Sequence, residues 1–145
     1  MDELAPERHT VVVEAPAHRV WAALTDPTSM ARWMAEPEVG LVVTTDWVVG
    51  SPIRMTGNVN GPFTNTGTVL RFDPPVGLGY TYRSSKSRVD DDAEHDAIVD
   101  IALSPDGPST TVTVTVERAL TSVIRHHLVH YWGVALAQLR QVVEG

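Results

Sequence analysis

The sequence predicts one α+β domain in which a curved antiparallel β-sheet wraps around a long C-terminal α-helix, with two short helices after the first strand. Three observations support this prediction. A β-branched segment near the start gives way to helical spacing, the middle consists of short strands separated by turns, and the end is amphipathic with a helical period. Because 145 residues is a common size for a single domain, we expect residues 1–145 to form one unit.

The first 34 residues predict one strand and two short helices. Residues 9–14 (HTVVVE) are rich in β-branched side chains and stop before Pro16, which is typical of a strand. The apolar residues within 17–24 are then spaced as on one face of a helix. Asp26 followed by Pro27 matches a capping residue and a first helical turn, so a second short helix is expected to continue to Met34.

The region between Val39 and Val116 alternates short β-rich runs with turn residues, which predicts an antiparallel meander. Its last two strands show the clearest alternation. One face of the sheet is therefore expected to be buried and the other to be exposed to solvent. The apolar side chains expected on the buried face are Val99, Ile101, Leu103, Val112, Val114 and Val116.

The segment 121–143 has the period of a helix with one apolar stripe, whereas Arg140 and Gln141 lie off that stripe. A single amphipathic helix has to bury its apolar face against another element. We therefore expect this helix to cover the buried face of the sheet. The stripe contains Ile124, Leu128, Trp132, Ala135, Leu136, Leu139 and Val143.

Composition excludes several classes of function. The net charge is −7 and no basic stripe is present, so nucleic acid is not an expected partner. The absence of cysteine excludes disulfides and cysteine metal sites, and it fits a reducing compartment. Residues 1–6 do not resemble a secretory signal, and no run reaches membrane-spanning length. We expect a cytoplasmic protein with no membrane partner.

No motif indicates a metal, a cofactor or a catalytic nucleophile. The sequence contains neither a GxSxG elbow nor a glycine-rich phosphate loop. His126 and His130 lie four residues apart on the expected helix, but no third ligand is identifiable, so we expect a solvent-facing polar surface here. The acidic segment 90–96 is expected to be a solvated loop.

Several strings together resemble one superfamily. They are VVVEAPAHRVWAALTDP, DWVVGSPI, GTVLRFDPP with GLGYTYRS, and YWGVALAQLRQVVE. Over residues 8–144 the chain resembles the START-like superfamily, often labelled SRPBCC, and within it the heat-shock-protein ATPase activator homologues. The resemblance implies the helix-grip fold and a ligand cavity between the sheet and the C-terminal helix.

The candidate ligand-binding residues are large apolar or amphipathic side chains, and each of them is also compatible with plain core packing. Arg125 falls within about 20° of Trp132 on the helical projection, so it reaches solvent at the first turns of the helix, forms a structural ion pair, or anchors the polar head of a ligand. The other candidates are Trp33, Met34, Trp47, Met55, Phe72, Tyr80, Tyr82, Leu128 and Trp132.

Three functions stay open. The first is non-catalytic binding of a small apolar or amphipathic molecule. The second is an enzyme of the polyketide cyclase or aromatase type, in which Arg125, Tyr80, Tyr82 and His127 would steer proton transfer. The third is an interaction module that stimulates a chaperone ATPase. The activators that the chain resembles carry a further upstream domain. We expect that this chain of 145 residues is too short to contain one. Whether the chain forms a homodimer also stays open.

Overall fold

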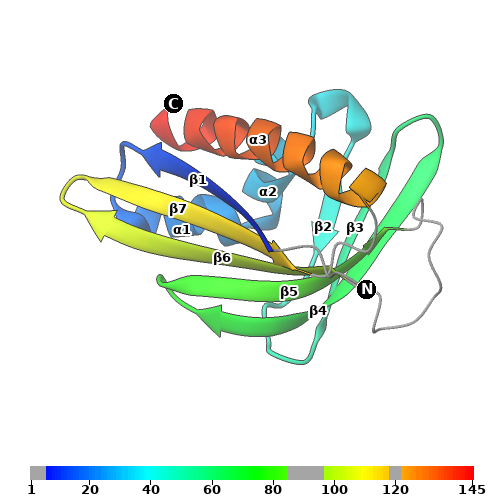
Figure 1. Cartoon of the computed structure of the whole chain (residues 1–145), viewed down its shortest axis with the longest axis horizontal. Helices are drawn as coiled ribbons and strands as arrows, with labels where there is room; N and C mark the ends of the chain where they lie inside the picture. Colours follow the sequence, from blue (N-terminus) through cyan, green and yellow to red (C-terminus); the bar gives the residue numbers. More distant parts are fainter. Residues whose placement is uncertain (1–5, 85–96, 118–121) are drawn as a thin grey trace.

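The computed structural model describes residues 6–84, 97–117 and 122–145, and for residues 84 and 122–128 it describes the backbone alone. The described residues form one seven-stranded sheet with three α-helices and a short 3-10 helix (Figure 1). In chain order the elements are β1 Glu7–Val13, α1 Ala17–Thr25, α2 Pro27–Trp33, η1 Pro37–Val39, β2 Val42–Thr44, β3 Pro52–Asn58, β4 Pro62–Asp73, β5 Gly77–Ser84, β6 Ala97–Asp106, β7 Ser109–Glu117 and α3 Ser122–Glu144.

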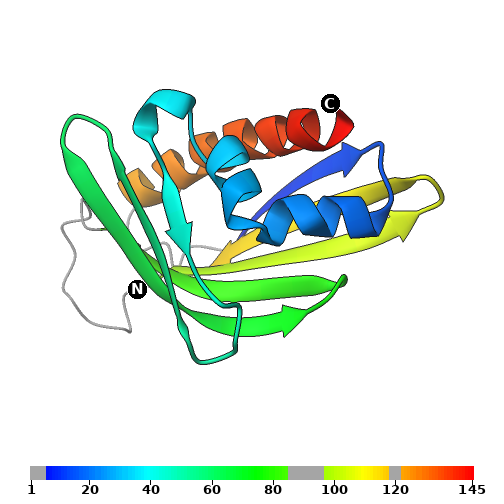
Figure 2. The same ribbon diagram turned by 180° about the vertical axis from the view of Figure 1, so that it is seen from behind.

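The sheet is antiparallel throughout, with the strand order β1-β7-β6-β5-β4-β3-β2. Figures 1 and 2 show that the sheet curves around α3, while α1 and α2 lie on the same side of it as α3. Contacts join α3 to β1, α1 and α2, and α2 also contacts β2. The predicted α+β helix-grip fold is therefore confirmed, including the two short helices after the first strand.

Local sequence explains where the short helices begin and end. The Asp26 side chain caps α2 by accepting a hydrogen bond from the backbone N–H of Ser29 at 3.1 Å, and Pro27 occupies the first helical position. Helix α2 ends at Trp33, with Met34 as its C-cap. The short helix η1 was not expected from the sequence. It ends at Gly40, whose φ of 64° lies in the left-handed region that favours glycine.

The core lies between α3 and the inner face of the sheet. All six predicted apolar residues of β6 and β7 are buried, and their neighbours in sequence are more exposed, as the alternation predicted. Among the described side chains of α3, the predicted stripe is buried as well, whereas Arg140 and Gln141 are exposed. The buried stripe consists of Trp132, Ala135, Leu136, Leu139 and Val143.

Hydrogen bonds attach the C-terminal end of α3 to helix α1 and to the turn between β1 and α1. The Arg19 guanidinium donates to the carbonyl oxygen of Val143 at 2.7 Å, and the backbone N–H of Glu14 donates to the Glu144 carboxylate at 2.9 Å. The hydroxyl of Thr110, which is completely buried, donates to the carbonyl oxygen of Ala15 at 2.9 Å. Strand β1, helix α1 and the end of α3 are thereby held together.

Among the helices of the described part of the chain, none combines the length and the apolar composition that crossing a bilayer requires.

Leu139 tests the packing of α3, because its side chain is fully buried in the core. We expect Leu139→Ala to lower the free energy of unfolding by about 2–5 kcal/mol, the range for truncation of a buried leucine. The matched control Val134→Ala removes an exposed side chain from the same helix and should change this energy by less than about 0.5 kcal/mol. Equal urea midpoints for the two variants would contradict the packing described here.

Candidate functional site

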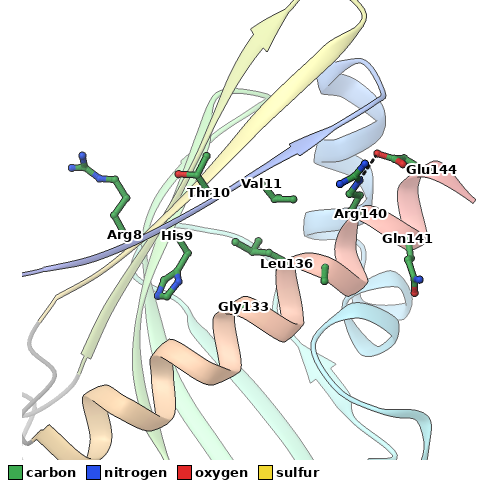
Figure 3. A pocket seen from close by; sticks show the side chains of 10 residues that line it. Arg8, His9, Thr10, Val11, Gly133, Leu136, Arg140, Gln141 and Glu144 are labelled. Carbon is green, nitrogen blue, oxygen red and sulfur yellow. Dashed lines mark hydrogen bonds and ion pairs between the residues drawn. The ribbon is translucent and has the colours of Figure 1, made fainter.

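A groove of about 650 Å³ runs between the edge strand β1 and helix α3 (Figure 3). Strand β1 pairs with β7 along one side, and its other side faces α3. The groove therefore lies where the sheet meets the C-terminal helix. Its lining residues are Arg8, His9, Thr10, Val11, Gly133, Leu136, Ala137, Arg140, Gln141 and Glu144.

Small residues on α3 make room for the groove. Gly133 and Ala137 lie one helical turn apart, and a side-chain carbon added at Gly133 would meet no atom within 4 Å. The side chains of Val11 and Leu136 point toward one another across the middle of the groove (Figure 3). The middle of the groove is therefore apolar and open enough for a ligand to pack on it.

One end of the groove is occupied by an ion pair. Arg140 Nε lies 3.1 Å from Glu144 Oε2, one helical turn away, and the same carboxylate accepts the hydrogen bond from Glu14 described above. The hydrogen bond from the Glu14 backbone and the nearby Arg140 guanidinium hold the pKa of Glu144 below its usual value. The charges at this end are thus largely satisfied within the protein.

The other end of the groove carries His9, whose side chain points from β1 toward α3 (Figure 3). Its Nε2 atom lies 3.5 Å from a carboxylate oxygen of Glu7, and Glu7 is only 5% exposed. Cross-strand pairing places Glu7 opposite the buried Val116, so its side chain faces the inner side of the sheet. A buried carboxylate next to an imidazole is a group that can bind or move a proton.

The sequence pattern predicts a first strand that begins at His9, so it does not single out Glu7 and His9 as site residues. Strand β1 begins two residues earlier, at Glu7. With that start, the two-residue alternation of a strand puts Glu7, His9, Val11 and Val13 on one face, as the burial pattern shows. A charged residue on the face shared with Val11 and Val13 was the signal that could have revealed this pair.

Five of the predicted ligand-binding residues meet on the inner side of the sheet, near the middle of α3. The rings of Trp33 and Trp132 lie 6.3 Å apart, and the Tyr131 ring lies 5.2 Å from that of Trp132. The Tyr131 hydroxyl donates to the carbonyl oxygen of Met34 at 3.0 Å. The five residues are Trp33, Met34, Tyr80, Tyr82 and Trp132, and Tyr131 joins them.

The tyrosines of this inner cluster lie close enough to influence one another. Burial raises the pKa of Tyr80, and the neighbouring Tyr82 raises it further. Burial is also the main reason that the pKa of Tyr131 is raised, with smaller effects of Tyr80 and Tyr82. The Nε1 donor of Trp132 is buried and has no hydrogen-bond partner in the part of the chain that the structure describes. Several polar groups therefore converge in an otherwise apolar region.

Trp47 and Phe72 lie together in a separate aromatic cluster. Their rings stack at 5.3 Å, and the ring of Trp21 lies 5.3 Å from that of Phe72. The Trp47 indole N–H donates to the carbonyl oxygen of Thr25 at 2.8 Å. Met55 is buried on β3. These contacts give Trp47 and Phe72 a packing role, whether or not they also touch a ligand.

The remaining candidates lie outside the described side chains. This applies to Arg125 and Leu128, and also to His126 and His127. His130 is exposed, as expected for a polar helix surface. Among the side chains that the structure describes, which exclude those of residues 84 and 122–128, no group of three or more histidine, cysteine or acidic residues could hold a metal ion.

Fold and site together define a START-like, helix-grip domain of the SRPBCC superfamily. Residues 14–144 match the family model described as Activator of Hsp90 ATPase homolog 1-like protein, so the chain belongs to that family. No curated protein matches the chain.

Solved structures agree with this fold. The protein CV1439 from Chromobacterium violaceum is 23% identical, with a TM-score of 0.80 and coverage of 98% of this chain and 99% of that one. ChR145 from Cytophaga hutchinsonii is 26% identical, with a TM-score of 0.81 and coverage of 99% and 97%. DynU16, a putative protein in the dynemicin biosynthetic locus, is 19% identical with a TM-score of 0.76. The match to DynU16 covers 96% of this chain and 47% of that protein.

The raised pKa of Tyr80 predicts how stability changes at alkaline pH. In the unfolded chain tyrosine ionises near pH 10, whereas buried Tyr80 stays protonated to higher pH. The unfolded state therefore gains charge first, and the stability present below about pH 10 is lost as the pH rises above it. We expect Tyr80→Phe to lose less stability than the wild type in this range. Urea midpoints measured from neutral pH to above about pH 10 check this, and identical slopes would contradict it.

Proposed function

We propose that this protein is a cytoplasmic binding protein for a small apolar or amphipathic molecule, held between the sheet and α3. The observation that supports the proposal most directly is the groove of about 650 Å³ between β1 and α3. Small-molecule sites commonly have volumes of about 300–1,000 Å³, apolar walls and a few polar groups. The groove has this character, with Val11 and Leu136 in the middle and polar residues at both ends.

The inner cluster extends this proposed site toward the core. Trp132 and Leu136 lie one helical turn apart on the same buried stripe, so the side chain of Leu136 lies next to both the groove and the cluster. We propose that Trp33, Met34, Tyr80, Tyr82 and Trp132 contact the part of the ligand that passes Leu136. The Trp132 indole N–H is the donor that such a ligand would satisfy.

A cyclase-type enzyme is the second candidate, and the convergence of Tyr80, Tyr82 and Tyr131 favours it. Tyrosine hydroxyls that converge in an apolar region can orient a reactive substrate and exchange protons with it. DynU16, a putative protein in the dynemicin biosynthetic locus, has a similar fold, which agrees with this candidate at the level of the fold. Turnover of a bound polyketide, abolished in Tyr80→Phe and Tyr82→Phe, would distinguish an enzyme from a carrier.

A bulky residue in the groove tests the leading proposal. Ala137 is exposed and lines the groove, so Ala137→Trp should fill much of its volume. The probe is anilinonaphthalene sulfonate, an acidic apolar dye whose fluorescence rises on transfer to an apolar site. We expect Ala137→Trp to weaken binding of the dye at least about tenfold, which corresponds to about 1.4 kcal/mol.

The matched control is Val134→Trp, which adds the same ring to an exposed position of α3 outside the groove. This variant should bind the dye as the wild type does. Equal affinity of all three proteins would show that the dye does not bind in the groove. Native mass spectrometry of the gently purified wild type provides an independent check, since a copurified ligand would report its mass directly.

A further inference from the structure

His9 lies at one end of the groove and has one ring nitrogen that the described residues leave without a hydrogen-bond partner. Its Nε2 faces Glu7, and within the described part of the chain its Nδ1 has no hydrogen-bond partner. The side chain is 16% exposed, so it is reachable without being freely solvated. A ligand in the groove would therefore meet the imidazole ring of His9.

The position of Glu7 determines what His9 offers to that ligand. A carboxylate oxygen of Glu7 faces Nε2 of His9, and a carboxylate oxygen accepts hydrogen bonds, so Nε2 is the ring nitrogen that donates to Glu7. The remaining nitrogen, Nδ1, then carries a lone pair. A carboxylate behind an imidazole fixes its tautomer and makes the remaining nitrogen a better proton acceptor. The distance of 3.5 Å is long, as is common for such pairs before a ligand binds.

The opposite end of the groove does not offer an equivalent acceptor. There the Glu144 carboxylate already receives hydrogen bonds from Arg140 and from the backbone of Glu14. The lowered pKa of Glu144 follows from the same contacts. Between the two ends lie Val11 and Leu136, which provide only apolar contacts. The lining also contains the Thr10 hydroxyl and the Gln141 amide, which can accept hydrogen bonds, but His9 is the lining side chain backed by a carboxylate.

We propose that Glu7 and His9 form a proton-accepting pair, and that the groove binds an apolar molecule whose hydroxyl, most favourably a phenol, donates to His9. This inference rests on the proposed function, because it concerns the same groove. It adds the chemical class of the ligand, namely a compact apolar ring system with a hydroxyl group at one end. Glu7 acts as the positioning residue and His9 as the residue that contacts the ligand.

Two probes that differ by one methyl group test the proposal. Calorimetric titration with 2-naphthol and with 2-methoxynaphthalene gives the ratio of the two affinities for each protein. We expect wild type to bind 2-naphthol about tenfold more tightly, which is within the range of one well-placed hydrogen bond. In His9→Phe, which keeps an apolar ring at this position, the ratio should fall to about one.

Two further variants separate positioning from general structural effects. Glu7→Gln keeps the shape of the buried side chain but removes its charge, so the affinity ratio should fall below that of the wild type. Arg54→Gln removes a charge from an exposed residue of β3 that does not line the groove, and should leave the ratio unchanged. A ratio is informative here because a merely structural loss weakens both probes equally.

The outcomes distinguish this proposal from the proposed function. Binding of both probes with the same ratio in wild type, His9→Phe and Glu7→Gln would overturn the role of the pair while leaving ligand binding intact. Tighter binding of 2-naphthoate than of 2-naphthol would also overturn it, because His9 would then present a donor. If the wild type binds neither probe and Ala137→Trp does not affect dye binding, the proposed function itself is wrong.

Discussion

The packing of α3 against the inner face of the sheet is the constraint on which the rest of the structure depends. The helix has one buried stripe, and the sheet has one buried face, supplied largely by β6 and β7. Neither surface is stable in water alone, because an amphipathic helix and a one-sided sheet both expose large apolar areas. Their association therefore determines the curvature of the sheet and the position of everything that lies between them.

This packing also explains why the groove lies where it does. At its C-terminal end α3 is held close to β1 by the hydrogen bonds from Arg19 and Glu14. In the middle of the helix Gly133 and Ala137 have little or no side chain, so β1 and α3 do not fill the space between them. The edge strand thus contributes to the core through Val13 and to an accessible surface through His9 and Val11.

The inner cluster contains two buried tryptophans whose indole donors differ in how they are satisfied. Trp33 is fully buried and donates from its indole nitrogen to the carbonyl oxygen of Ala23, so its polar group is satisfied within the protein. The equivalent group of Trp132 is buried without such a partner. Burying an unpaired donor costs free energy. The contrast between these two tryptophans is therefore a reason to look for a ligand near Trp132 and a packing role for Trp33.

Short-range patterns in the sequence determined the elements and the buried faces. The alternation of Val112, Val114 and Val116 and the capping pair Asp26 and Pro27 depend only on neighbouring residues, so they could be read directly. The same is true of the stripe on α3, which follows from the period of a helix. The resemblance to a known superfamily then supplied the order in which these elements pack.

Tertiary structure alone decided which distant residues meet. Glu7 and His9 reach α3 only because β1 pairs with β7 at the edge of the sheet, and β7 directly precedes the segment that leads to α3. Phe72 stacks on Trp47 because the register of β4 and the left-handed turn at Trp47, with φ of 57°, bring their rings together. The physical reason is that periodicity reports which face of an element is apolar, whereas contacts between elements depend on how the curved sheet and its helices are arranged in space.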